Sequence, residues 1–134
     1  MKINWKRILI AAIWADLVAF IIYAIAYNFT QSPVIFILDF VGVLFLGGFW
    51  VTRKIESHFV LHGFLVGVGT NIVYLLLRPF DPGVASEANL TALQLVLIFS
   101  IIIFLKILGC VFGAFVGGKW RRAQLAAQNI RVQI

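Results

Sequence analysis

Four long apolar stretches, separated by short polar segments, form the hydropathy pattern of this 134-residue chain. Each stretch holds about 18 residues or more, which as a helix with a rise of 1.5 Å per residue matches a hydrocarbon core of roughly 30 Å. None of them alternates in the way that barrel strands do. The pattern therefore predicts one all-α domain, a polytopic membrane bundle of four helices at about residues 8–27, 34–51, 59–77 and 90–116.

The segments between the stretches contain recognisable helix boundaries. Pro33 is expected at the start of the second helix, because proline suits the first helical position. Either Asn89 or Thr91 could cap the fourth helix. The fourth stretch is longer than a bilayer requires, so it should tilt or protrude. A basic tail, 119–134, follows it, and residues 119–125 could continue the helix along the membrane surface.

Basic residues indicate the orientation. With four spans, Arg78 lies alone on one side, and nine other lysines and arginines lie on the opposite side. These nine are Lys2, Lys6, Arg7, Arg53, Lys54, Lys119, Arg121, Arg122 and Arg131. Cytoplasmic loops carry an excess of lysine and arginine, which predicts that both termini are cytoplasmic.

Composition excludes several classes of protein. Hydrophobic residues make up 63% of the chain and charged residues 12%, which is too apolar for a small soluble domain. The net charge of +6 follows the topology rule, so membrane lipids rather than nucleic acid are the expected partner. The lipid-headgroup residues would be Arg53, Lys54, Lys119, Arg121 and Arg122. Trp50 and Trp120 would anchor the interface.

Rare polar residues within the spans are the most informative feature. Asp16, Asp39, Asn71 and Lys106 fall one in each apolar stretch. A charge at the bilayer centre is costly, so these side chains should face the protein interior, a partner or water. Lys106 lies at nearly the same depth as Asp39, which predicts an Asp39–Lys106 ion pair with Asn71 hydrogen-bonded nearby. The flexible lysine side chain could also reach toward Asp16. Asp16 would join this cluster or face a second subunit.

This polar cluster has two interpretations. As a structural network it would fix the register of the helices and the oligomeric state. As a proton or ion relay it would mark a transport path, because intramembrane carboxylates and lysines often do so. A relay also needs access to water, which the sequence does not show.

Glycines share helical faces with these polar residues. Gly109, Gly113 and Gly117 follow Lys106 on one face, and Gly63 and Gly67 precede Asn71 in the same way. Small residues allow the backbones of membrane helices to approach closely. These five glycines are therefore the predicted helix-packing positions.

The sequence gives little support for a catalytic or metal site. His58 and His62 are four residues apart, as zinc ligands can be, but a third ligand is not evident and a metal site is not expected. Cys110 lies among apolar residues, which predicts an inert thiol. No phosphate loop or metalloprotease motif is present, so neither an enzyme nor a cofactor is expected.

The stretch Gly47-Gly48, Arg53-Lys54 and residues 61–67 resembles that of small four-span bacterial membrane proteins of unknown function. The resemblance covers about a sixth of the chain and implies a fold class but no activity. The size is similar to that of small multidrug exporters, but those carry a glutamate in the first helix, where this chain has only Asp16.

Four short helices enclose little volume, so assembly with other chains is expected. The sequence favours a non-catalytic subunit of a homo-oligomer or a larger membrane complex. The alternative is a small oligomeric ion- or proton-coupled transporter or channel that uses the intramembrane Asp and Lys residues. A third candidate is a lipid-binding or membrane-bound enzyme accessory.

Overall fold

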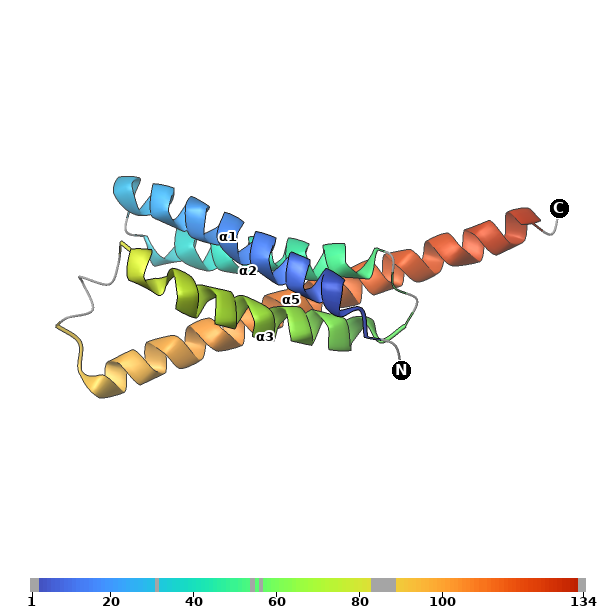
Figure 1. The fold of residues 1–134 in the computed structure, drawn as a ribbon. Helices are drawn as coiled ribbons and strands as arrows, with labels where there is room; N and C mark the ends of the chain where they lie inside the picture. The colour runs from blue at the N-terminus through green and yellow to red at the C-terminus, as the bar shows by residue number, and fades with distance from the viewer. Residues whose placement is uncertain (1–2, 31, 54, 56, 83–88, 133–134) are drawn as a thin grey trace.

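The computed structural model describes residues 3–30, 32–53, 55, 57–82 and 89–132 (Figure 1). Within these residues the fold is all-helical and contains no strand. The elements are α1 (Trp5–Phe29), α2 (Pro33–Thr52), α3 (Phe59–Leu77), the short 3-10 helix η1 (Arg78–Phe80) and α5 (Ala92–Val132).

Three of these segments are long and apolar enough to cross a membrane: Trp5–Phe29, Phe59–Phe80 and Ala92–Gln128. In α2 the corresponding apolar segment is shorter, Phe36–Thr52. All four long helices run roughly along one axis in Figure 1. The predicted all-α membrane bundle of four helices is confirmed as a fold.

Local side-chain chemistry explains where the helices begin. The Asn4 side chain accepts a hydrogen bond from the backbone N–H of Arg7 and caps α1. Pro33 occupies the start of α2, as predicted. Before α5, the Thr91 hydroxyl accepts from the Gln94 N–H, and the Gln94 side chain accepts from the Thr91 N–H. This reciprocal capping box identifies Thr91, rather than Asn89, as the cap.

α5 ends beyond the predicted apolar stretch, and the continuation into the tail that the sequence allowed is observed. The helix extends to Val132, well past the predicted end at residue 116, and includes the described part of the basic tail. The 41 residues of α5 correspond to about 61 Å of helix. The change from apolar to basic residues after Gly118 marks the end of the apolar segment, whereas no proline follows to end the helix itself.

Packing places α2 and α3 in the middle of the bundle. Both α1 and α5 pack against α2 and α3, while α1 and α5 scarcely contact each other. The N-terminal part of α5 diverges from the other helices, and its C-terminal part projects beyond them (Figure 1). Both chain termini lie toward that same end of the bundle.

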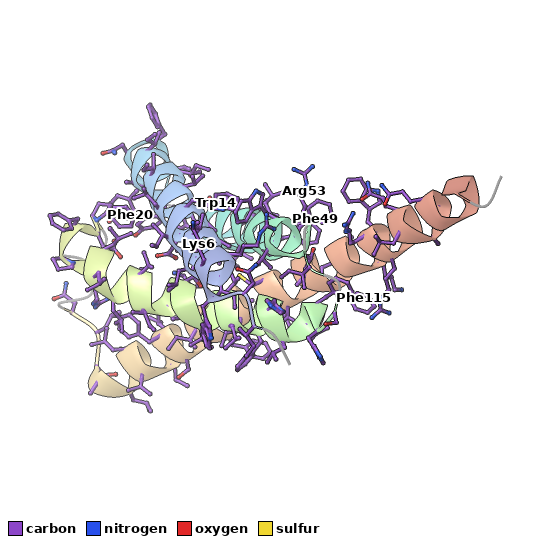
Figure 2. The ribbon with its side chains drawn as sticks, turned by 45° about the vertical axis from the view of Figure 1, so that its right-hand side comes forward. Lys6, Trp14, Phe20, Phe49, Arg53 and Phe115 are labelled. Atoms are coloured by element: carbon purple, nitrogen blue, oxygen red, sulfur yellow. The ribbon has the colours of Figure 1, made fainter. Side chains whose placement is uncertain are left out.

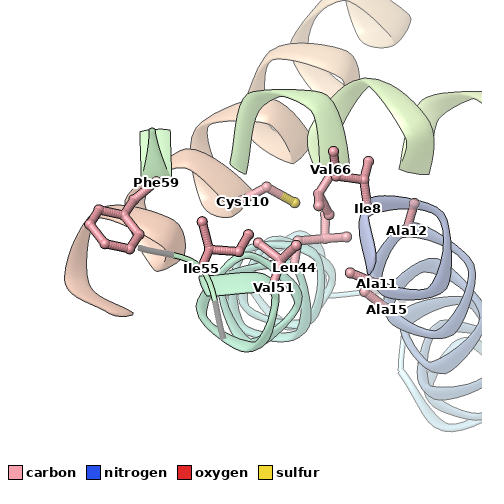
Figure 3. Packing of buried hydrophobic residues seen from close by; sticks show 10 residues of the cluster. All are labelled: Ile8, Ala11, Ala12, Ala15, Leu44, Val51, Ile55, Phe59, Val66 and Cys110. Carbon is pink, nitrogen blue, oxygen red and sulfur yellow. The ribbon is translucent and has the colours of Figure 1, made fainter. Parts of the chain in front are cut away.

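The apolar core lies in the half of the bundle nearer the termini (Figure 3). On the α1 side it consists mostly of alanine, which allows α1 to approach its neighbours closely. Leu44 and Val51 from α2, Val66 from α3 and Cys110 from α5 fill the space between the four helices. Cys110 is a buried free thiol.

Candidate functional site

A buried ion pair connects the first and last helices. The Lys106 Nζ of α5 donates to the Asp16 Oδ1 of α1. Lys106 is 0% exposed and Asp16 is 1% exposed, so both residues are buried within the bundle. Since α1 and α5 scarcely contact each other otherwise, this pair spans the bundle between helices that lie on opposite sides of α2 and α3.

Aromatic rings surround the lysine. Its Nζ lies 4.4 Å from the ring centroid of Tyr74 in α3 and 5.5 Å from that of Phe40 in α2. Each ring presents its electron-rich face to a cation, which partly replaces the hydration that the ammonium group has lost. All four long helices therefore supply a group to the Lys106 site.

Asp39 is not the described partner of Lys106, which corrects the predicted Asp39–Lys106 pair. Asp39 is 8% exposed, and both of its carboxylate oxygens are buried without a hydrogen-bond partner among the described residues. Helical phase gives the reason. α2 contacts Gly109 of α5 through Val41, two residues after Asp39, and two residues turn a helix by about 200°. Equal depth therefore does not bring the two side chains together.

Asn71 also stays apart from the ion pair in the described structure. Its side-chain amide donates to the Gly67 carbonyl oxygen of its own helix at 2.8 Å. The Asn71 Oδ1 and the Asp16 Oδ2 are buried without hydrogen-bond partners among residues whose placement is described. Of the four predicted polar residues, Asp16 and Lys106 therefore form an ion pair, whereas Asp39 and Asn71 are not part of it.

The predicted packing glycines lie where backbones meet. A Cβ atom on Gly113 would fall on the carbonyl oxygen of Phe45 in α2. In return, a Cβ on Gly48 of α2 would fall on the carbonyl oxygen of Cys110. This reciprocal contact is the tightest part of the seam between α2 and α5, and Gly48 was not among the predicted packing positions.

The other predicted glycines extend this seam and form a second one. Gly109 faces Val41, and Gly117 faces Phe49 and Thr52. Gly63 and Gly67 of α3 face the backbone of α5. Added Cβ atoms at those two positions would lie 2.7 Å from the Cys110 oxygen and 2.7 Å from the Ile107 Cα, respectively. α5 thus packs on α2 through its own glycines and on α3 through the glycines of α3.

Asp81, which the sequence interpretation did not select, connects α1 and α3 at the end away from the termini. The Tyr23 hydroxyl donates to its Oδ1 at 3.0 Å, and the Tyr74 hydroxyl donates to its Oδ2 at 3.3 Å. Tyr74 thus places its ring over Lys106 and its hydroxyl on Asp81. The available signal was an acidic residue directly after a helix end.

Removing one hydroxyl should loosen this connection. Tyr23→Phe is expected to lower the free energy of unfolding by about 1 kcal/mol, because one part-buried hydrogen bond to a carboxylate is lost. Denaturant titration of the detergent-solubilised protein measures the change. Tyr27→Phe is the matched control, since the Tyr27 ring stacks on Phe36 but no hydrogen bond of its hydroxyl is described. Equal losses in the two variants would contradict the assigned role of Tyr23.

His62 of α3 connects its helix to the segment before α1 near the chain termini. It is buried, its Nδ1 donates to the His58 carbonyl oxygen at 2.9 Å, and its Nε2 accepts from the Asn4 N–H at 3.3 Å. Since Nε2 accepts, the network assigns the ring proton to Nδ1. His58 has a left-handed backbone, with φ of 56°, as the N-cap of α3. Within the described part of the chain, no three potential ligands gather around a metal position.

The predicted interfacial residues gather at the end of the bundle near the termini. Trp120 stacks on Phe49, with ring centroids 5.6 Å apart. Arg53 points away from the bundle at the end of α2 (Figure 2), and Lys119 lies over the ring of Phe115. Arg122 lies over the ring of Phe59, while the Nε of Arg121 is buried without a described partner. Lys54 lies outside the described residues.

Comparisons of the chain with protein-family models, with curated proteins and with solved structures give no match. The function is therefore inferred from the geometry of the chain alone.

Proposed function

We propose that this chain is a non-catalytic structural subunit of a homo-oligomer or of a larger membrane complex. The observation that supports this function best is the buried, paired state of Asp16 and Lys106, both at most 1% exposed. A group that passes ions or protons needs access to water, whereas a group that fixes helix register needs only its partner. The aromatic rings around the lysine favour the second role.

The proposed topology has four spans, with α2 as the fourth. α2 has 20 residues, which is about 30 Å of helix and enough for a hydrocarbon core. The basic residues at the end that bears both termini support a cytoplasmic location of that end in a bacterial inner membrane.

The N-terminal half of α5 supports assembly with other chains. Its apolar side chains remain uncovered on several sides as the helix diverges from the bundle, with Leu93 70% exposed and Phe104 63% exposed. This half is the most extended apolar surface that α5 offers. A second copy or another membrane subunit would pack against it through van der Waals contacts.

Cysteine cross-linking in native membranes tests the assembly. The native Cys110 is buried, so a cysteine introduced at an exposed position is the reactive one. Ile101→Cys is expected to give intermolecular cross-links with a short bifunctional reagent, because Ile101 lies on the uncovered half of α5. Leu17→Cys on exposed α1 is the matched control and should cross-link several-fold less.

Native mass spectrometry in mild detergent then identifies what is bound. A mass equal to several copies indicates a homo-oligomer, and a co-purifying chain indicates a larger complex. A monomer without any bound chain, together with no Ile101→Cys cross-link, would overturn the proposal.

One observation favours a second candidate, an oligomeric ion- or proton-coupled transporter or channel. Asp39 keeps both carboxylate oxygens buried without a described partner, as an unused ion or proton site would. Under this alternative, Asp39→Asn or Asp16→Asn would abolish ion flux into proteoliposomes. Under the structural proposal, wild-type liposomes leak no more than empty ones.

A further inference from the structure

One buried histidine ring joins α3 to the segment before α1. His62 of α3 is 1% exposed, whereas its partner Asn4 is exposed. The Asn4 N–H donates to the His62 Nε2 at 3.3 Å, and of the hydrogen bonds described it is the one that joins this segment to α3. Ile3, the residue before Asn4, is partly buried against the apolar core. The His62–Asn4 contact therefore lies between the interior and an exposed residue at the end of the bundle.

The contact requires a neutral imidazole. Nδ1 carries the ring proton and donates to the His58 carbonyl oxygen at 2.9 Å, so the lone pair of Nε2 accepts from Asn4. A proton taken from water would bind to that lone pair and make Nε2 a second donor. Two N–H groups would then face each other, so the bond to Asn4 would break while the bond to His58 stays.

Positive charge surrounds the ring. His62 lies in the first turn of α3, and Asn4 is the N-cap of α1, so the positive ends of two helix dipoles meet at the ring. Arg7 of α1 donates its backbone N–H to the Asn4 side chain. Arg122 of α5 lies over the ring of Phe59, the first residue of α3. A charged ring is therefore less well accommodated in this contact than in water.

The described acids lie elsewhere. Asp16 belongs to the buried ion pair, Asp81 binds two tyrosines at the opposite end, and Asp39 lies about 20 Å of helix before Thr52. Glu56, the acid nearest to His62 in sequence, lies outside the described residues, as does Lys54. The other charged or titratable side chains described at this end belong to Lys6, Arg53, His58, Lys119 and Arg121.

We propose that the His62–Asn4 contact is a pH-sensitive switch that holds the segment before α1 on α3 while the ring is neutral. When the ring gains a proton, the Asn4 N–H turns to water and Ile3 leaves the core. Both the charged ring and the freed N–H are hydrated in this released state, so acid favours release. The switch is contained in one chain and does not depend on the proposed assembly.

Hydrogen exchange of the full-length protein tests the switch between pH 8 and pH 5, the range in which histidine changes charge. Protection factors corrected for the intrinsic effect of pH are measured by mass spectrometry on a peptide that covers residues 3–8. In wild type they should fall about fivefold at pH 5, because one hydrogen bond is lost. His62→Gln keeps an acceptor that does not titrate, so its protection should be equal at both pH values.

Matched variants separate His62 from its neighbours. His58→Asn removes the other, exposed histidine ring and should respond like wild type, because asparagine tolerates the left-handed backbone at this position. Glu56→Gln should also keep the response. His62→Phe fills the site with a ring that lacks the acceptor, so residues 3–8 should exchange fast at both pH values.

Three results would overturn the proposal: equal protection of wild type at both pH values, a fall that persists in His62→Gln, or a fall that disappears in Glu56→Gln. Nitrogen-15 NMR of the wild-type histidine rings is a check that needs no folded His62 variant. A proton on Nε2 of His62 at pH 8 would equally contradict the switch. Helical circular dichroism at both pH values ensures that faster exchange does not reflect global unfolding.

Discussion

Replacing Lys106 with methionine is expected to lower the free energy of unfolding by about 3–5 kcal/mol. Methionine fills a similar volume but leaves the Asp16 carboxylate buried without its cation. The variant also loses the contacts of the ammonium group with the rings of Tyr74 and Phe40. Thermal or SDS-induced unfolding in detergent measures the loss. Lys119→Met, which removes an exposed lysine from the same helix, is the control and should change stability little.

A double variant shows whether the loss comes from the pair. Asp16→Asn/Lys106→Met removes both charges, and replacing a whole buried pair is far less harmful than breaking it. The double variant should therefore recover most of the stability that Lys106→Met loses. If the two single losses simply add, Asp16 and Lys106 are not energetically coupled, and the structural role of the pair is refuted.

The helices and their packing glycines are readable from the sequence because both depend on local spacing. Apolar length gives the helices, and Gly109 and Gly113 share a face by their spacing alone. The end of α5 is different. It is set by how far helix-forming residues continue, whereas the hydropathy pattern reports only where the apolar residues end. This is why the predicted end at residue 116 falls short of Val132.

The partner of Lys106 could not be read from depth. Depth along the membrane normal follows from counting residues, but the direction of a side chain depends on how each helix is rotated in the bundle. Asp39 and Lys106 are near each other in depth, yet α2 presents Val41 and Phe45 to α5. Asp16 was expected to join the cluster or to face a second subunit, with the flexible Lys106 side chain long enough to reach toward it. The long lysine side chain does join α1 and α5 across the bundle.

The second large effect is expected at Gly113. Gly113→Ala should destabilise the bundle by about 1–3 kcal/mol, even though alanine favours a helix by about 1 kcal/mol over glycine. The added methyl group would meet the Phe45 carbonyl oxygen, and a backbone atom cannot move aside as a side chain can. Adding Gly48→Ala blocks the reciprocal contact at Cys110, so the double variant should fail to form the seam between α2 and α5.

Gly42→Ala is the matched control, because it also replaces a glycine of α2 but has no neighbour within 4 Å of the added Cβ. There the gain in helix propensity acts alone, so Gly42→Ala should stabilise the protein by about 0.5–1 kcal/mol. The same chemical change thus has opposite expected signs at two glycines. Thermal unfolding of both variants in one detergent measures this difference. Similar effects at the two positions would mean that α2 and α5 do not meet backbone to backbone, because only that contact makes a methyl group at Gly113 unfavourable.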